Sequence, residues 1–346
     1  MNNIFKKILA AALSVALLSF GYLYSQDFRP LLFKVAEKKV SEIVASNTLD
    51  KNDFKLLFCG TGSPNRTVER GQPCTALIAD GKLFLFDAGE GTIAKLIEYG
   101  APIGQLKTIF LTHLHSDHIS GVAEVLHNTA LYGRRHEIET FGPPGTEKVA
   151  KGFELTYEED LTERQRVLGP ENLDIAQVFS GAKDILVSDN NLKTLHDENG
   201  LKISAFVVIH PDWHHAYGYK VEYKGKSIVI SGDTAPSAGI RQHAINADIL
   251  IHEALNSEIF NYIADQMDVQ KAAISKDRFP KIAAAHTTTL DLAKIAQETN
   301  VKSLIITHLI PAVPDIWFVD QFFTSGMDEI YQGEIIVARD GQWITL

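Results

Sequence analysis

The stretch THLHSDH at residues 112–118 places four potential metal ligands close together: His113, His115, Asp117 and His118. Imidazole nitrogens and carboxylate oxygens are good ligands for a borderline divalent cation, and zinc is the usual one. Two histidines two positions apart on extended backbone could converge on one ion. The aspartate and the third histidine, at the start of the next helix, could face a second ion. A single histidine on an apolar face is usually a satisfied core residue, but that interpretation does not explain four ligands within six residues. The stretch therefore predicts a metal site.

Two ions need more than four ligands, so we expect the rest of the chain to supply the others. Three candidates come at the ends of apolar runs that predict strands: His210 after 205–209, Asp233 after 227–230 and His308 after 303–306. Ligands that follow strands at one edge of a sheet converge in space. An aspartate could bridge two ions, because its two oxygens can face different metals. The common position of the three candidates strengthens a case that each alone would make weakly.

The remaining chain must provide the sheet edge on which these residues meet. Apolar runs bounded by glycine and aspartate predict further strands at 55–59, 75–79, 83–86, 108–111, 201–209, 217–223, 248–251 and 334–338, and helical patterns occur at 92–99, 122–131 and 290–298. The polar region 143–200 predicts two helices, 147–156 and 159–167, and a strand pair. Two sheets packed together and covered by helices are the architecture that this order favours.

Further motifs accompany the ligands: FCGTGSP at 58–64, LFDAGEGT at 85–92, SGDT at 231–234, HEA at 252–254, AHTTT at 285–289 and ITHL at 306–309. Together with HLHSDH and His210, they resemble the metallo-β-lactamase superfamily over residues 53–346. The likeness is closest to the ribonuclease Z and arylsulfatase-like branch. The resemblance implies an α/β fold of the four-layer αββα sandwich type, with a dinuclear zinc centre that binds two Zn²⁺ per chain.

The resemblance also assigns roles to the site residues. It gives His113, His115 and His210 to the first zinc, Asp117, His118 and His308 to the second, and Asp233 as the bridge between them. It also matches Glu253 and His286 to the branch's carboxylate–histidine pair and makes Asp117, His286 and Glu253 the catalytic residues. In an alternative interpretation, His286 only begins the helix at 290–298, because the run HTTT fits a helix cap.

The chemistry that the resemblance implies is ester hydrolysis. Two Zn²⁺ ions lower the pKa of a shared water, so that a metal-bridging hydroxide exists near neutral pH and attacks the ester. The ions also stabilise the negative charge that grows on the non-bridging oxygens. His286 would protonate the leaving oxygen while Glu253 holds its ring.

Other residues within the motifs allow more modest predictions. Asp87 would orient a zinc-binding histidine, whereas Glu90 is interpreted as a solvated loop charge. Gly60 and Gly62 predict a tight turn beside the site.

Histidines and aromatic residues near the ligands have two interpretations each. His214 and His215 predict an exposed pair in a loop, although one of them could reach the pocket. Trp213 and Tyr219 could stack on an aryl substrate, but packing is the favoured interpretation for both. In the same way, Trp317 and Phe318 could close the pocket behind His308, or only pack at its rim.

Charge and one missing insertion bear on the substrate. The net charge is −10 and no Lys/Arg run exceeds short pairs, which argues against nucleic acid as the substrate. Long-loop ribonuclease Z enzymes carry a Gly/Pro-rich arm that grips tRNA between GY and the GDT strand. Here Gly218-Tyr219 leads through a Lys224-Gly225 turn directly into the SGDT strand, which leaves no room for the arm. HPDWHHAYGY at 210–219 resembles the arylsulfatase-like members instead.

We therefore expect an arylsulfatase-like hydrolase that cleaves a small sulfate ester with an aryl leaving group. One alternative is a phosphodiesterase, acting either on a small molecule or, like ribonuclease Z, as an endonuclease at the 3′ end of tRNA. Another is a non-catalytic zinc-binding domain. A β-lactamase is disfavoured, because one large lactamase group carries a cysteine at the position of Asp233. The expected partner is a small-molecule ester, and the expectation allows a homodimer.

The start of the chain predicts export. Lys6 and Lys7 precede the uncharged apolar run 8–24, so residues 1–26 are expected to be a signal peptide or an uncleaved N-terminal anchor. A connecting segment at 27–51, with a helix at 31–44, and a hydrolase domain at 52–346 would follow. The protein would then be periplasmic or secreted, or anchored to the inner membrane.

The chain has two cysteines, Cys59 and Cys74. In an exported protein they could form a disulfide. They could equally be two small buried residues on neighbouring strands.

Overall fold

The computed structural model describes residues 30, 32–35, 37, 49–65, 67–188, 191–211, 213–266 and 278–346. The chain separates into two compact units, Met1–Ser46 and Asn47–Leu346. The described residues of the first unit are helical, and all of them except Pro30 lie within the helix expected at 31–44. The predicted signal or anchor at 1–26 lies outside the described residues. None of the described helices combines the length and the apolar character that a membrane span requires.

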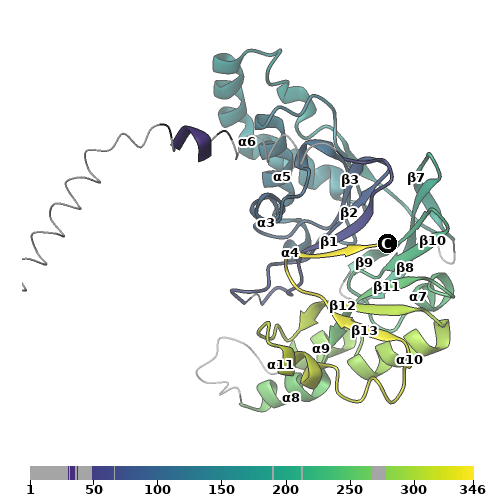
Figure 1. The fold of residues 1–346 in the computed structure, drawn as a ribbon. Helices are drawn as coiled ribbons and strands as arrows, with labels where there is room; N and C mark the ends of the chain where they lie inside the picture. Colours follow the sequence, from purple (N-terminus) through teal and green to yellow (C-terminus); the bar gives the residue numbers. More distant parts are fainter. Residues whose placement is uncertain are drawn as a thin grey trace, which may run out of the picture. The chain divides into compact units, whose positions relative to one another are not determined.

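The second unit contains two seven-stranded mixed sheets (Figure 1). The first sheet runs in the order β14 (Gln342–Thr345), β1 (Phe54–Gly60), β2 (Cys74–Ala79), β3 (Lys82–Phe86), β4 (Leu106–Phe110), β5 (Glu139–Gly142) and β6 (Ala182–Asp184). The second runs in the order β13 (Glu334–Val337), β12 (Ser303–Ile310), β11 (Ile249–Leu255), β10 (Lys226–Ile230), β9 (Trp213–Tyr223), β8 (Leu201–His210) and β7 (Lys193–Glu198). Apolar side chains of both sheets, such as Phe58 and Phe84 from the first and Tyr217 and Ile228 from the second, form one buried cluster between them.

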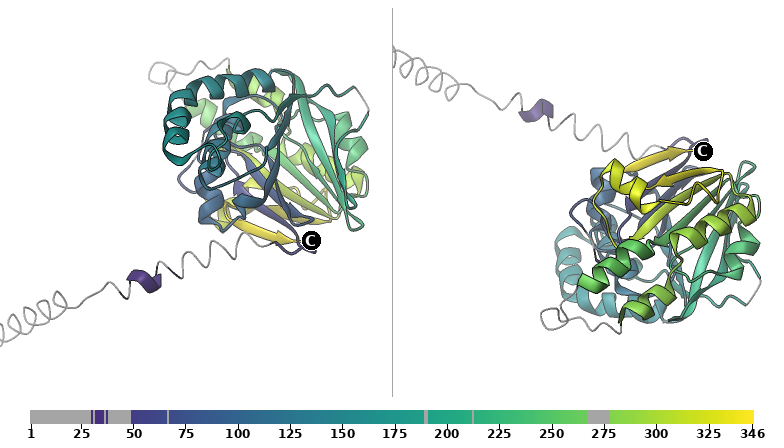
Figure 2. Two further views of the ribbon diagram at one scale, coloured as in Figure 1. Left: turned by 90° about the horizontal axis from the view of Figure 1, so that it is seen from above. Right: turned by 90° about the horizontal axis from the view of Figure 1, so that it is seen from below.

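Helices cover the outer face of each sheet, as Figures 1 and 2 show. The first sheet packs against α3 (Thr92–Glu98), α5 (Val122–Leu131) and α6 (Thr146–Leu168). The second packs against α7 (Ala238–His243), α10 (Thr289–Thr299) and α11 (Trp317–Phe323). Two further helices, α8 (Ser257–Gln266) and α9 (Arg278–Ala285), meet around Leu255 and Ile310. These four layers confirm the predicted αββα sandwich.

Parallel strands in both sheets bring the motif residues to one edge. Strands β3 to β6 are parallel to one another in the first sheet, and β10 to β13 are parallel in the second. Because ligand sites of parallel sheets form at the carboxyl ends of the strands, the segments that follow β3, β4 and β10 are placed to meet.

Two expectations for the region 143–200 were wrong. The two helices predicted there form one 23-residue helix, α6. The two residues between the predicted pieces, Tyr157 and Glu158, are helical as well, and Tyr157 packs against the buried cluster of the first sheet, as an inward-facing residue of a continuous helix does. The predicted strand pair does not form either, because β6 joins β5 in the first sheet while β7 joins β8 in the second.

The hairpin between β9 and β10 has a two-residue turn. Lys224 and Gly225 both have positive φ angles, 51° and 72°, as a type I′ turn requires. The two strands are in register from Tyr223 and Lys226 onward, so nothing is inserted between GY and the SGDT strand.

Cys59 and Cys74 form a disulfide that joins the end of β1 to the start of β2. Both residues are also buried, at 1% and 2% exposure. Both interpretations of these cysteines therefore hold, because the two residues are buried on neighbouring strands and are also joined by a disulfide.

Candidate metal centre

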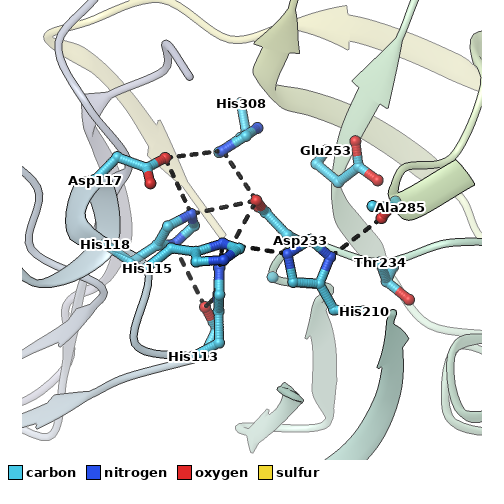
Figure 3. Close-up of polar contacts among 12 residues, drawn as sticks. His113, His115, Asp117, His118, His210, Asp233, Thr234, Glu253, Ala285 and His308 are labelled. Atoms are coloured by element: carbon cyan, nitrogen blue, oxygen red, sulfur yellow. Dashed lines mark hydrogen bonds and ion pairs between the residues drawn. The ribbon is translucent and has the colours of Figure 1, made fainter. Parts of the chain in front are cut away.

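Side chains from both sheets converge on one point at the sheet edge (Figure 3). His113 and His115 lie in the loop after β4, Asp117 and His118 in the short helix α4 (Ser116–Ile119), His210 at the end of β8, Asp233 after β10 and His308 within β12. The potential ligand atoms of His113, His115 and His210 lie within 4.8 Å of one another, and so do those of Asp117, His118 and His308. The structure thus brings together both predicted ligand sets.

Asp233 lies between the two sets, as a bridging residue must. Its Oδ2 atom is 3.2 Å from His308 Nε2, 3.4 Å from His118 Nε2 and 3.9 Å from His113 Nε2. The carboxylate therefore contacts members of both sets.

The contacts inside each set fit a shared metal ion better than hydrogen bonds. The Nε2 atoms of His118 and His308 both lie 3.4 Å from Asp117 Oδ2. These three atoms are buried and have no hydrogen-bond partner among the described residues. Leaving such atoms unpaired is costly. Ligand atoms about 2.0–2.2 Å from one tetrahedral ion lie roughly 3.3–3.6 Å apart, so a divalent ion would satisfy all three.

The first set has the same character. His115 Nδ1 lies 2.9 Å from His113 Nε2 and 3.3 Å from His210 Nε2. Three imidazole nitrogens that face one another cannot all be satisfied by sharing protons, whereas all three lone pairs can bind one cation. Both groups could therefore hold a metal ion.

Burial and charge act against each other at the carboxylates. Burial would raise the pKa of Asp117 and of Asp233, but the neighbouring His118 and His308 outweigh it and hold both pKa values well below the usual range. Burial also lowers the pKa of His113, in the same direction as the charge of His118. Both carboxylates are thus held in the ionised form that binds metal.

One buried carboxylate orients a histidine of each set. Asp87, after β3, accepts hydrogen bonds of 2.8 Å from His118 Nδ1, from the Thr112 backbone N–H and from the Thr112 hydroxyl. The Thr112 oxygen in turn lies 3.1 Å from His113 Nδ1. Both histidines therefore have Nδ1 engaged, which turns Nε2 toward the centre. The contacts agree with the orienting role predicted for Asp87.

Glu253 and His286 lie beside the two sets. The Glu253 carboxylate is 3.4 Å from His286 Nδ1 and accepts a 2.7 Å hydrogen bond from the Thr287 N–H. Burial opposes a charge on His286, but the negative charge of Glu253 outweighs it and raises the pKa of His286 to about 9. The cap of α10 is Thr288, whose hydroxyl accepts from the Asp291 N–H. His286 therefore has no capping role and remains a candidate acid.

Comparison with known proteins identifies the family. Residues 68–294 match the metallo-beta-lactamase superfamily. The chain belongs to this superfamily. A ribonuclease Z of Mycobacterium avium is 27% identical over 273 residues, which cover 75% of this chain and 87% of that protein. The short form of human tRNase Z is 25% identical, with a TM-score of 0.59 and coverage of 84% of this chain and 98% of that one. Both confirm the predicted ribonuclease Z branch.

A metallo-β-lactamase fold protein, YhfI of Bacillus subtilis, also superimposes on this chain. The TM-score is 0.59 at 18% identity, and the match covers 85% of this chain and all of that one. At this identity the likeness supports the fold alone.

The other residues singled out in the sequence are exposed polar residues and two glycines at a close backbone contact. Glu90 is exposed, and so are His214 and His215. Gly60 and Gly62 are required for a close approach of two backbone segments, since a Cβ atom would lie 1.8 Å from the Gln72 carbonyl oxygen and 2.9 Å from that of Arg70. Neither glycine has a positive φ angle.

The four aromatic residues divide into three kinds. Tyr219 is a core residue, fully buried, and its hydroxyl donates to the Leu111 carbonyl. Trp213 lies against the histidines. Trp317 and Phe318, at the start of α11, pack against each other and are 66% and 56% exposed.

Two residues that hold the site were not predicted. Thr112 stands directly before His113 in the motif, and only that position could have drawn attention to it. Arg70 is fully buried and donates to the Thr61 hydroxyl at 2.9 Å and to the Val313 carbonyl at 3.0 Å. It thereby ties the loop after β1 to the segment that follows His308. Nothing in a single sequence marks that contact.

Replacing Asp87 by asparagine is expected to weaken divalent metal binding about 10- to 100-fold, because the charge that fixes His118 and Thr112 is lost. The measurement is the metal retained per chain during competition with a chelator. Asp80→Asn is the matched control, since Asp80 is also a buried carboxylate, at 8% exposure, but pairs with Lys82 and Asn199 away from the site. Equal metal retention by the two variants would contradict the orienting role.

Proposed function

We propose that this chain is a zinc-dependent phosphodiesterase that binds two zinc ions. The observation that carries the proposal is the pair of histidine–aspartate sets joined by Asp233, with His286 and Glu253 beside them, in a chain that resembles ribonuclease Z over three-quarters of its length. Ribonuclease Z cleaves a phosphodiester. The sulfate-ester expectation has no support among these relatives, so it ranks second.

The substrate is proposed to be a small diester and not precursor tRNA. The two-residue turn at Lys224 and Gly225 leaves no arm that could grip tRNA at that position. The net charge of −10 does not favour a long polyanion either.

The proposed roles follow from the two ligand sets. His113, His115 and His210 would hold one ion, Asp117, His118 and His308 the other, and Asp233 both. When bound, the ions acidify water near neutral pH and offset negative charge on the phosphate oxygens. Asp117 keeps its negative charge toward the second ion, and His286 donates a proton to the leaving oxygen while Glu253 holds the imidazole in place.

The first test compares bis(p-nitrophenyl) phosphate, p-nitrophenyl sulfate and a precursor tRNA on the purified full chain, after its zinc has been counted. We expect about two zinc ions per chain and the fastest turnover for the phosphodiester. His115→Ala is expected to lose about 100-fold or more, since it removes a direct ligand, and even indirect partners cost 10- to 100-fold. His214→Ala, an exposed neighbour, is the control.

Each other outcome of this comparison selects an alternative. Faster turnover of the sulfate would restore the arylsulfatase expectation, and cleavage of the tRNA at its 3′ end would indicate ribonuclease Z activity. Zinc without turnover of any ester would favour a non-catalytic domain.

The acid role of His286 predicts a pH dependence. A histidine that must be protonated to act gives a rate that falls as pH rises past its pKa, here about 9. Glu253→Gln removes the charge that raises this pKa, while the amide oxygen can still accept from Thr287. The descending limb of kcat against pH should therefore move to lower pH by a unit or more. An unchanged profile would contradict the role.

We also propose that the protein is exported. The basic and apolar start of the chain and the disulfide between Cys59 and Cys74 support this, because disulfides persist in oxidising compartments. Cells that express the chain should release it with the periplasmic or medium fraction, and alkylation without a reductant should label neither cysteine. A cytoplasmic protein with two reactive thiols would overturn the proposal.

A further inference from the structure

The solvent-exposed part of the candidate metal centre, called its open side below, is formed by two of its residues. His113, Asp117, His118, His210, Asp233 and His308 are each at most 4% exposed. The two members that are partly exposed are His115 and His286, and the side chain of His286 is 10% exposed. These two rings are therefore where a ligand arriving from solvent would first meet the cluster.

Trp213 borders this open side. Its ring centroid lies 5.3 Å from that of His115, with an interplanar angle of 72°, and 6.4 Å from that of His113 at 69°. The side chain is partly exposed, unlike Tyr217 and Tyr219 further along the same strand, which are fully buried. In the described part of the chain, Trp213 is the aromatic residue other than histidine in ring contact with the predicted ligands.

The backbone holds Trp213 at this place. It is the first residue of β9 and pairs in register with His210, the predicted ligand at the end of β8. Edge-to-face contact with the two histidine rings fixes the indole further. The part of a bound ligand that extends from the metal centre past His115 would meet the Trp213 ring, whose position is already fixed.

We propose that Trp213 binds a planar aromatic group of the substrate by stacking, and that it thereby selects aryl or nucleoside esters over alkyl esters. The inference rests on the proposed function for the placement of the phosphate. Stacking on an aromatic side chain needs only a π face, so an aryl ring and a nucleobase share this chemistry.

The experiment measures binding by calorimetry on the zinc-loaded full chain, with phenylphosphonate and methylphosphonate as probes. These ligands carry the same anionic head and differ in the aromatic ring. We expect the phenyl compound to bind about ten-fold more tightly. Trp213→Ala should abolish this preference and leave the affinity for methylphosphonate unchanged, while Trp213→Phe should keep most of it.

Two controls separate recognition from folding. Zinc content must be equal in all variants, and Trp343→Ala, a 38% exposed tryptophan on β14, should change neither affinity. Thymidine 5′-phosphate as a third probe distinguishes the sources, since tighter binding than phenylphosphonate indicates a nucleobase and weaker binding an aryl group.

The inference is overturned if the phenyl preference survives in Trp213→Ala, or if both phosphonates lose affinity equally, because Trp213 would then only support His115. Binding does not depend on turnover. A phenyl preference that depends on Trp213, in a chain that cleaves no diester, would therefore reject the proposed function and keep the stacking site.

Discussion

The arrangement of the site depends on two buried carboxylates, Asp117 and Asp233. A carboxylate removed from water must be compensated by positive charge or by hydrogen bonds. Here the compensation comes from imidazoles, and several of their nitrogens remain unpaired among the described residues. A bound cation would satisfy these nitrogen atoms, and it would link the stability of this sheet edge to metal binding.

The sandwich supplies the rigidity that such a site needs. The candidate ligands lie within or at the end of a strand, in the loop after it, or in the short helix α4, and the strands are held by the packed layer between the sheets. Asp87 aligns His118 directly and His113 through the Thr112 hydroxyl. Arg70 holds the segment after His308 by a hydrogen bond to the Val313 carbonyl. Asp87 and His308 also adopt positive φ angles, 59° and 45°, which are uncommon outside glycine. Such backbone persists where the surroundings fix it, and it often marks a functional site.

The chemistry and the choice of substrate are determined in different places. The two ligand sets, with Glu253 and His286, form the proposed hydrolytic centre, and two metal ions held there would suit the tetrahedral centre of a phosphate or a sulfate ester. In our proposals the substrate is chosen by what surrounds the open side: the hairpin without an insertion after Tyr223, and Trp213 beside His115. This division explains why the same motifs led to the sulfate-ester expectation while the relatives favour a phosphodiester.

The sequence by itself determined the fold class and the candidate ligands that the structure brings together, because both depend on local order. Ligand types follow predicted strands at short spacing, and strand and helix patterns alternate along the chain. Prediction from the sequence was wrong where packing against distant segments determines the secondary structure and the strand pairing. The two helical patterns at 147–156 and 159–167 gave no sign that one helix continues through Tyr157 and Glu158, and β6 and β7 joined different sheets.

The tertiary structure alone decided the contacts that cross the sandwich. Arg70 binds the segment after His308 across more than 240 residues of chain, and Trp213 reaches His115 from the other sheet. It also united the two interpretations of Cys59 and Cys74, which are both buried and bonded. Such contacts leave no periodic signal, since only the packing of two sheets fixes which side chains meet.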